Sequence, residues 1–481
     1  MSRAATALLL ATLVPALLGG CQTLAPFRTD PQSAELPLAD TWTAAVAGQA
    51  VASGWVHSLG DPRLSFLVAE AVAKNYDLRA AAARVRAAQA QAALTATGER
   101  PAVDLAAGAT RRGSATASGV RSTGNSFNTQ FDVAWETDVW GRLADATNAA
   151  ELDARAITAD HAAARLSLAA SVAQAWFNTL EAERQLALAK ETARNFGDNL
   201  GIVEDGFRSG LNSALDVRLE RANLAGAQAR QAARTIDRDR ALRGLELLLG
   251  RYPGAELATE QKLPHLTSSV PAGLPADLLR RRPDVRGAAL RLQAADRRVD
   301  EARKERLPSI RLTGAGGVSS GELRHLLDFD SLLWNIATSI AAPIFDAGRI
   351  DAQVTLQKAR ADEALSNYAQ TVLTAFREVE TALAAEAHLA TQESALRTAA
   401  DESERAATLA LERYRKGLVD IITWLEARRR AFDARSSLIN ISNQRLQNRI
   451  ALHLALAGDF TDANEGGAET RSGDAPREIN K

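Results

Sequence analysis

The sequence predicts a mainly α-helical protein with a small membrane β-sheet, built by duplication of one helix–strand–strand–helix–helix unit. Three observations support this fold class. Long Ala-rich runs without proline predict long helices, two pairs of alternating segments predict strands, and one set of motifs occurs twice at a constant separation. Together they predict two copies of one structural unit in a single chain.

The composition excludes several classes of protein. The 481 residues are 46% hydrophobic and 24% charged, with a net charge of -1. This hydrophobic content is ample for a core, so the chain is not generally disordered, and the balanced charge argues against nucleic-acid binding. A polytopic α-helical membrane protein is excluded because repeated apolar runs of ~20 residues are lacking. One cysteine and scattered histidines predict no disulfide, no metal site and no cofactor.

The first 20 residues have the pattern of an export signal. An apolar stretch over residues 4–18 is too short to span a bilayer as a stable helix. It ends in the sequence LGGC, whose last residue is Cys21, and this resembles the lipobox of bacterial lipoproteins. The resemblance implies that Cys21 becomes an acylated mature N-terminus, carrying chains such as palmitate, and that residues 21–61 form a lipidated extension. Several acyl chains give stable anchoring. A plain signal peptide with an incidental cysteine is the alternative.

One set of motifs occurs twice at an offset of 207 positions (284 minus 77). Asp77-Leu78-Arg79 matches Asp284-Val285-Arg286, and Pro101 matches Pro308. The sequence FRSGL at 207–211 likewise matches YRKGL at 414–418. Because the offset holds without a gap, we infer that the chain arose by duplication.

Each repeat has the same order of elements. A helical stretch ends before a proline, which cannot continue a helix, and is followed by two strands and two long helices. The first repeat spans 62–250 (helical stretch 62–98, strands about 102–111 and 127–139, helices 142–206 and 212–250). The second spans 277–458 (helical stretch 277–306, strands about 309–318 and 332–345, helices 349–413 and 419–457). A linker at 251–276 contains four prolines, and we expect a mobile tail at 459–481.

The predicted strands alternate as transmembrane β-strands do. Phe127, Phe131 and Trp135 share one face of the strand at 127–139, and Asn128 and Gln130 share the other. Apolar-out, polar-in alternation over about ten residues fits a barrel around water, although a soluble sheet with one wet face is the alternative. Four strands cannot close a barrel in lipid, so copies of the chain must share one. Two copies would give eight strands and three would give twelve; only the larger barrel leaves a lumen, which favours a homotrimer if the protein is a conduit.

The long helices are predicted to extend far into water. The run at 142–206 has no proline and would reach about 100 Å at ~1.5 Å per residue. The run at 349–413 is equally long. An ordinary helical bundle is the alternative, but strands between the helices make it less fitting.

Several motifs then resemble those of TolC-like outer-membrane factors. The sequence GLPADLLRRRPDVR at 273–286 resembles the signature between the repeats of that family. The sequences WETDVWGR at 135–142 and PIFDAGR at 343–349 resemble its strand-to-helix junctions. The resemblance covers about 40–460, and the lipobox points to the lipoprotein (NodT-type) branch.

The resemblance implies a homotrimer with a 12-stranded β-barrel in the cell outer membrane of a Gram-negative bacterium, continuous with a long α-helical barrel in the periplasm. It implies no enzymatic activity. The expected role is passive efflux of drugs and toxic organics, with outer-membrane lipid around the barrel and with a periplasmic adaptor protein and an inner-membrane RND-type pump as partners. A duct for metal ions or for type I protein secretion, and a non-conducting periplasmic coiled-coil scaffold lipoprotein, remain the alternatives.

The resemblance also implies which residues carry function. The helix-turn tips, which meet the adaptor in this family, map to Arg208, Ser209, Gly210 and Leu211, and to Lys416, Gly417, Leu418 and Val419.

The periplasmic gate of the family maps to Ile422, Glu426 and Arg429, whose spacing places them on one helix face. Three copies of Glu426 would form an acidic ring that favours cations. The chain departs from the family pattern, with Glu426 where Asp is common and Arg428 where Gln usually precedes the arginine. A surface ion pair without a gating role is the alternative.

Overall fold

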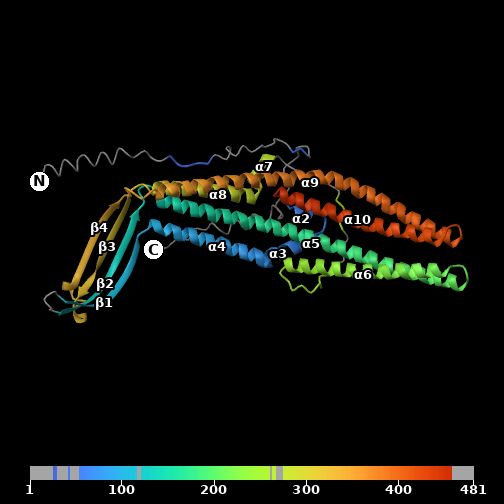
Figure 1. Ribbon diagram of the computed structural model, residues 1–481, viewed down its shortest axis with the longest axis horizontal. Helices are drawn as coiled ribbons and strands as arrows, with labels where there is room; N and C mark the ends of the chain where they lie inside the picture. Colours follow the sequence, from blue (N-terminus) through green and yellow to red (C-terminus); the bar gives the residue numbers. More distant parts are fainter. Residues whose placement is uncertain are drawn as a thin grey trace. The chain divides into compact units, whose positions relative to one another are not determined.

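The structure is a computed structural model that describes residues 25–29, 42–43, 54–115, 121–259, 263–266 and 275–457. The predicted lipidation site Cys21, the signal peptide and the predicted tail at 459–481 lie outside the described residues. The described chain is mainly helical with one β-sheet, which confirms the predicted fold class (Figure 1). Among the described residues, none of the helices combines the length and apolar character needed to cross a membrane.

The long helices recur at the predicted separation. Both ends of each long helix in the first repeat shift by 207 positions to give the corresponding long helix of the second. The long helices are α5 (Arg142–Arg208), α6 (Ala214–Leu248), α9 (Arg349–Arg415) and α10 (Ile421–Ala455). The shorter ones are α2 (Trp55–Ser58), α3 (Pro62–Lys74), α4 (Tyr76–Ala96), α7 (Pro275–Arg281) and α8 (Pro283–Lys304), with 3-10 turns at Thr97–Glu99, Leu323–His325 and Phe329–Ser331.

The predicted helical stretches at 62–98 and 277–306 are each broken once. The first breaks at Asn75, whose backbone is extended and whose side-chain oxygen accepts a hydrogen bond from the N–H of Leu78 at 3.0 Å. The second breaks at Arg282, because the following Pro283 disfavours helical geometry in the residue before it. Asn75 and Arg282 are equivalent positions of the two repeats, so both breaks belong to the duplicated unit.

The return helices begin later and end earlier than predicted. α6 begins at Ala214, not 212, because Ser213 caps it, and α10 begins at Ile421, not 419, because Asp420 caps it. The two helices end at Leu248 and Ala455, short of the predicted 250 and 457. Gly250 and Ala457 lie just beyond these ends with a positive φ, which cannot continue a right-handed helix.

The chain divides into two compact units. One comprises residues 1–34, 89–153 and 290–366 and contains the sheet; the other comprises residues 35–88, 154–289 and 367–481 and contains most of the long helices. The core of the second unit is centred on Trp176, Phe177, Leu64 and Leu245. The indole N–H of Trp176 donates to Asp61 at 2.7 Å, which satisfies a polar group inside this core.

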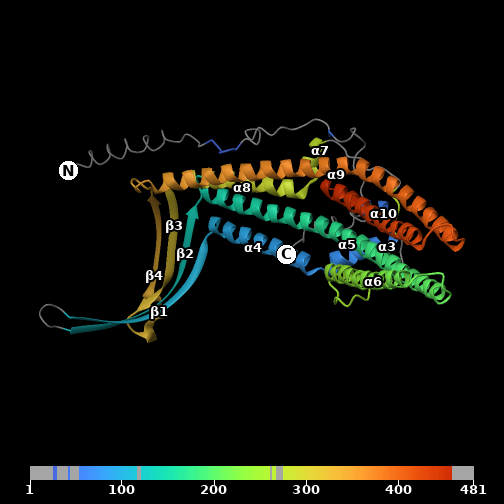
Figure 2. The same ribbon diagram turned by 45° about the vertical axis from the view of Figure 1, so that its right-hand side comes forward.

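The sheet has four antiparallel strands in chain order, β1 (Ala102–Ala115), β2 (Arg121–Thr137), β3 (Ser309–Ser320) and β4 (Leu332–Ala341) (Figure 2). The register aligns the predicted alternation across all four strands, because directly paired residues share a face. One row on the first face consists of Leu105, Phe131, Gly316 and Trp334. The next row, on the opposite face, consists of Asp104, Asp132, Ala315 and Asn335. The sheet is therefore apolar on one face and polar on the other.

The strand ends differ from those predicted. β1 runs on to Ala115 and β2 starts at Arg121, because a Gly-, Ser- and Thr-rich segment without hydrophobic alternation still pairs in register. β3 likewise runs to Ser320. β2 ends at Thr137, not 139, where the chain turns into α5. β4 ends at Ala341, not 345, because Pro343 has no N–H to pair with a neighbouring strand.

Candidate functional site

The helix-turn tips are two equivalent reversals, one between α5 and α6 and one between α9 and α10. Gly210 and Gly417 adopt φ values of +74° and +70°, a conformation that residues with a Cβ rarely adopt. The N–H of Leu211 donates to Gly206 at 2.8 Å, and the N–H of Leu418 donates to Arg413 at 2.9 Å. These hydrogen bonds satisfy carbonyls at the ends of the long helices, so glycine is the residue that each tip requires.

Each tip is followed by a capped helix. Ser213 and Asp216 form a reciprocal capping box, in which the carboxylate of Asp216 accepts from the N–H of Ser213 at 2.8 Å. At the equivalent position, Asp420 accepts from the N–H of Thr423 at 2.8 Å. Hydrogen bonds from the side chain and the N–H of Thr423 hold the pKa of the Asp420 carboxyl below its usual value. The caps fix where the return helices start, and so fix the length of each tip.

The tips carry exposed leucines next to a buried cluster of apolar side chains. Leu211 and Leu418, which are equivalent, are 82% and 70% exposed. Beneath them, Trp424 is fully buried and stacks on Tyr414 with ring centroids 5.2 Å apart. The same cluster contains Val203 of α5, so the two tips lie side by side. Of the eight predicted tip residues, all are exposed except Val419, which is half-buried.

The three predicted gate residues lie on α10 as expected from their spacing. Arg429 donates two hydrogen bonds to Glu426, from Nη2 at 2.9 Å and from Nε at 3.0 Å. Arg430, which the sequence analysis did not single out, donates a third from Nε at 3.0 Å. Together they hold the pKa of the Glu426 carboxyl below its usual value. Ile422 is 58% exposed. The signal for Arg430 was its position four residues after Glu426.

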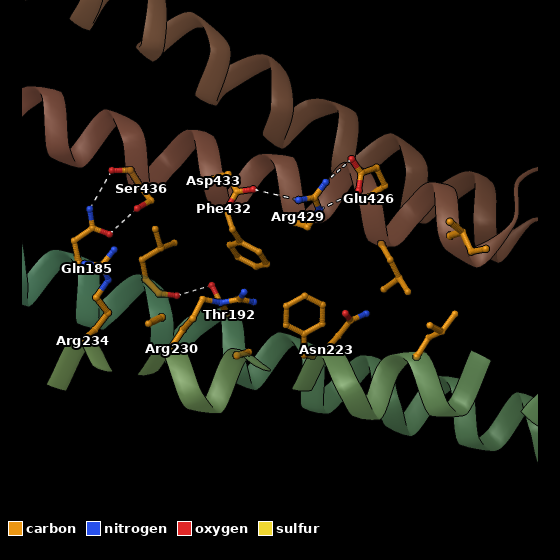
Figure 3. Close-up of a pocket in the computed structure, with 17 residues that line it drawn as sticks. Gln185, Thr192, Asn223, Arg230, Arg234, Glu426, Arg429, Phe432, Asp433 and Ser436 are labelled. Carbon is orange, nitrogen blue, oxygen red and sulfur yellow. Dashed lines mark hydrogen bonds and ion pairs between the residues drawn. The ribbon is translucent and has the colours of Figure 1, made fainter. Parts of the chain in front are cut away.

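The gate residues line a groove of about 460 Å³ between α10 and the pair α5 and α6 (Figure 3). Its walls mix polar and charged side chains with apolar ones, among them Phe196 and Phe432. In the close-up, Arg429 and Glu426 project from α10 above Thr192 and Asn223. At one end the hydroxyl of Ser436 donates to the side chain of Gln185 at 2.8 Å, which connects α10 to α5. The helix that carries the gate residues is therefore linked to the helix on the other side of the groove.

A buried carboxylate near the gate was missed by the sequence analysis. Glu220 of α6 is 0% exposed, and the side-chain amide of Asn223 donates to its Oε2 at 3.1 Å. Its Oε1 has no hydrogen-bond partner among the described residues. Burial raises the pKa of the Glu220 carboxyl, against the opposing effects of Asn223, Asn199 and Arg428. The available signal was its place in the apolar stripe of α6, three residues after Val217 and seven before Ala227.

Comparison with known proteins finds the same unit twice. The family model described as "Outer membrane efflux protein" matches residues 67–251 and again residues 274–458. The two matches are separated by 207 positions at both ends, as are the long helices of the structure.

The chain is similar over nearly its whole length to outer-membrane components of efflux pumps. It is 33% identical to outer membrane protein OprJ of Pseudomonas aeruginosa (94% of this chain, 96% of the relative). It is 32% identical to the cation efflux system protein CusC of Escherichia coli (85% and 88%) and 31% identical to the toluene efflux pump outer membrane protein TtgF of Pseudomonas putida (84% and 85%). A crystal structure of a membrane protein from Pseudomonas aeruginosa superposes with a TM-score of 0.82 at 32% identity, covering 88% of this chain and 97% of that one.

Proposed function

Because the chain belongs to the outer membrane efflux protein family, we propose that three copies of it assemble into one conduit whose inner end is closed at Ile422, Glu426 and Arg429. The chain is an outer-membrane channel component of an efflux system. The proposal adds the trimer, the gate, an acyl anchor on Cys21, a periplasmic adaptor at the tips and an inner-membrane pump of the RND type. It includes no catalytic step.

The observation that carries the proposal is the open, two-faced sheet. β1 and β4 are its outer strands, so among the described residues each leaves one row of N–H and C=O groups without a neighbouring strand. In lipid such groups each cost several kcal/mol, so the edges need strands from other copies. Eight strands would enclose a filled interior, whereas twelve leave a lumen lined by the polar face. A trimer therefore satisfies both the edges and the conduit.

Equivalent positions of the repeats support the same assembly. Leu454 of α10 packs against the core cluster that contains Trp176 of the first repeat. Its equivalent Leu247 of α6 is 68% exposed, and Tyr252, five positions later in the chain, is 88% exposed. In a ring in which the two repeats alternate, Leu247 would pack against the second repeat of the next copy. Such a repeated head-to-tail contact is the kind that closes a ring.

The gate is proposed as a ring of ion pairs. In each copy Glu426 is held by Arg429 and Arg430 of its own helix. Because two arginines offset each carboxylate, we expect weaker cation preference than a bare acidic ring would give. The pump selects which substrates are transported, and we propose drugs and toxic organics as these substrates. CusC is named for cations and TtgF for toluene, so a metal-ion duct is the second candidate.

Single-channel recording on the purified full-length protein tests the proposal. The wild type is expected to conduct weakly, and Glu426→Ala with Arg429→Ala to raise conductance severalfold. The matched control is Asp239→Ala with Arg243→Ala, which removes a partly exposed ion pair of 3.7 Å on α6. A protein that never conducts, even with the gate pair removed, is a scaffold lipoprotein and not a duct.

Trimer assembly and lipid anchoring are tested by separate experiments. We expect heat-sensitive trimers in detergent, which Leu247→Asp converts to monomers. Incorporation of labelled fatty acid is expected to disappear in Cys21→Ser, and label retained there would remove the anchor from the proposal.

A further inference from the structure

The β1–β2 hairpin is longer than the rest of the sheet. Phe127 of β2 pairs with Ser320, the last residue of β3. Beyond that pair β1 and β2 continue to pair with each other up to Ala115 and Arg121. Figure 2 shows the two strands running on past the ends of β3 and β4. This extension is at the strand ends away from those that connect to helices.

The extension carries arginines on the apolar face of the sheet. Arg111 pairs with Asn125, and Arg121 pairs with Ala115. Since faces alternate along a strand, Arg111 and Arg121 lie on the same face as Leu105, and the neighbouring Arg112 lies on the polar face.

These cations lack counter-charges. Arg111, Arg112 and Arg121 are exposed, and none forms an ion pair with a carboxylate in the part of the chain that the structure describes. The sequence also has no Asp or Glu between Asp104 and Asp132. Positive charge is thus concentrated in this hairpin.

The apolar face changes from apolar residues to arginine at the position along β1 expected for a membrane surface. A transmembrane β-strand needs about 9–11 residues, and β1 begins at Ala102, so Arg111 lies at the end of such a span. Below it, the apolar face of β1 consists of Val103, Leu105, Ala107 and Ala109. Arg121, the other arginine on this face, lies roughly 13 Å further from the helix-connected ends of the strands than Arg111. Arginines at this height face lipid headgroups, not hydrocarbon.

The second hairpin does not share this feature. The positions equivalent to Arg111 and Arg121 are Val318 and Asp328. In the connection between β3 and β4 the one arginine has a partner: Arg324 pairs with Glu322 at 2.6 Å, and His325 lies 2.8 Å from Asp328. The uncompensated pair of arginines is therefore specific to the first hairpin and does not follow from the shared unit.

We propose that Arg111 and Arg121 bind the phosphate groups of an anionic, phosphorylated lipid in the outer leaflet around the channel. A guanidinium donates two parallel hydrogen bonds to phosphate, which an ammonium cannot do in the same geometry. The spacing of the two arginines fits a headgroup that carries two separated phosphates. The inference rests on the proposed orientation of the conduit, with the hairpin at its outer end.

The test measures binding of bisphosphorylated lipid A, and of dephosphorylated lipid A, to the full-length protein in detergent. Arg111→Ala and Arg121→Ala are each expected to weaken binding of the phosphorylated lipid about fivefold. Arg112→Ala removes the same charge from the adjacent residue on the polar face, and is expected to change affinity less than twofold. The Arg111→Lys and Arg121→Lys variants keep the charge and should retain part of the affinity.

Three outcomes would overturn the inference: an unchanged affinity in the double alanine variant, an equal loss in Arg112→Ala, or equal binding of the dephosphorylated lipid. Inorganic phosphate is tested alone, and competition by it at micromolar concentration would indicate a free anion in place of a lipid. Conductance is recorded on the same variants and should be unchanged. A protein that binds lipid A but never conducts would overturn the conduit and leave the lipid site standing.

Discussion

Asn75 and Arg282 lie at equivalent positions of the two repeats and donate to equivalent carbonyl groups. The side-chain amide of Asn75 donates to the carbonyl of Leu248 at 3.0 Å, and Nη1 of Arg282 donates to that of Ala455 at 3.1 Å. Both acceptors are the last residues of long return helices, where carbonyls have no partner within the helix. The interaction has thus been kept through duplication while its donor changed from an amide to a guanidinium.

Removing the amide of Asn75 is expected to destabilise the helical unit. Asn75→Ala loses both the bond to Leu248 and the cap on Leu78, in a residue that is only 5% exposed. We expect a loss of about 2 kcal/mol in the free energy of unfolding, measured by denaturant titration in detergent. Asn75→Asp keeps the capping oxygen and loses only the donor, so it should fall between the wild type and alanine. Equal stability of Asn75→Ala and wild type would show that the Leu248 carbonyl is satisfied by water.

Replacing Ala457 by glycine is expected to stabilise the folded protein. It has a φ of +49°, whereas the equivalent Gly250 has a φ of +70°. A residue with a Cβ in this region costs about 1–2 kcal/mol, so Ala457→Gly should raise the free energy of unfolding by about 1 kcal/mol. The reverse change, Gly250→Ala, should destabilise, because its Cβ would lie 2.9 Å from the carbonyl oxygen of Lys74. Thermal melting of both variants checks the prediction, and a lower midpoint for Ala457→Gly would contradict it.

His453 should make the protein less stable in mild acid. It is buried and stacks on Trp55 with ring centroids 5.5 Å apart. Burial, and next the positive charge of Arg449, lower the pKa of His453 from 6.5 to about 4, with Glu386 opposing. Between these two values the unfolded chain binds a proton that the folded chain does not, so stability falls as pH falls from 6.5 to 4.

The loss through that window is expected to be roughly 3 kcal/mol. Denaturant titrations across this pH range measure it. His453→Phe keeps an aromatic ring without a titrating group and should remove this slope. His388→Gln, at an exposed position of α9, is the control and should leave the slope intact. An unaltered slope in His453→Phe would assign the pH dependence to other groups.

The exposed leucines of the tips should matter for partner binding and not for folding. We expect Leu211→Asp and Leu418→Asp each to weaken binding of the cognate adaptor at least tenfold, because a charge would be buried at the contact. Melting temperatures should be unchanged, since both side chains are mostly in water. Leu323→Asp, in the connection between β3 and β4, introduces the same charge on a leucine that is 65% exposed and serves as the control. Equal adaptor affinity of all variants would place the contact elsewhere.

Much of the architecture could be predicted because the sequence contains it twice. Proline and glycine at a constant offset located the strand starts and the tips in both repeats, and the caps at Ser213 and Asp420 moved the helix starts by only two residues. Alternation located the middle of β2, where hydrophobic residues recur. The start of β2 at Arg121 could not be found in this way, because pairing with β1, and not hydrophobic alternation, sets it.

The remaining features depend on contacts between distant segments. The break at Asn75 is stabilised by the carbonyl of Leu248, a partner 173 positions away that no local pattern reveals. The burial of Glu220 was missed because a charged residue on a helix is ordinarily assigned to water. The pairing of Glu426 with Arg429 was foreseen only as the alternative to a gating role, from a spacing that lies within one turn of α10.

The equal lengths of the helix pairs restrict how the reach of the protein can change. α5 and α9 each contain 67 residues, and α6 and α10 each contain 35. An insertion of one heptad in α5 alone would displace its tip by about 10 Å and separate Asn212 from Tyr414 of the other tip, its present partner at 3.4 Å. In the proposed conduit, the helices can therefore match a deeper or shallower periplasm only by coordinated insertions, which change their length in discrete steps.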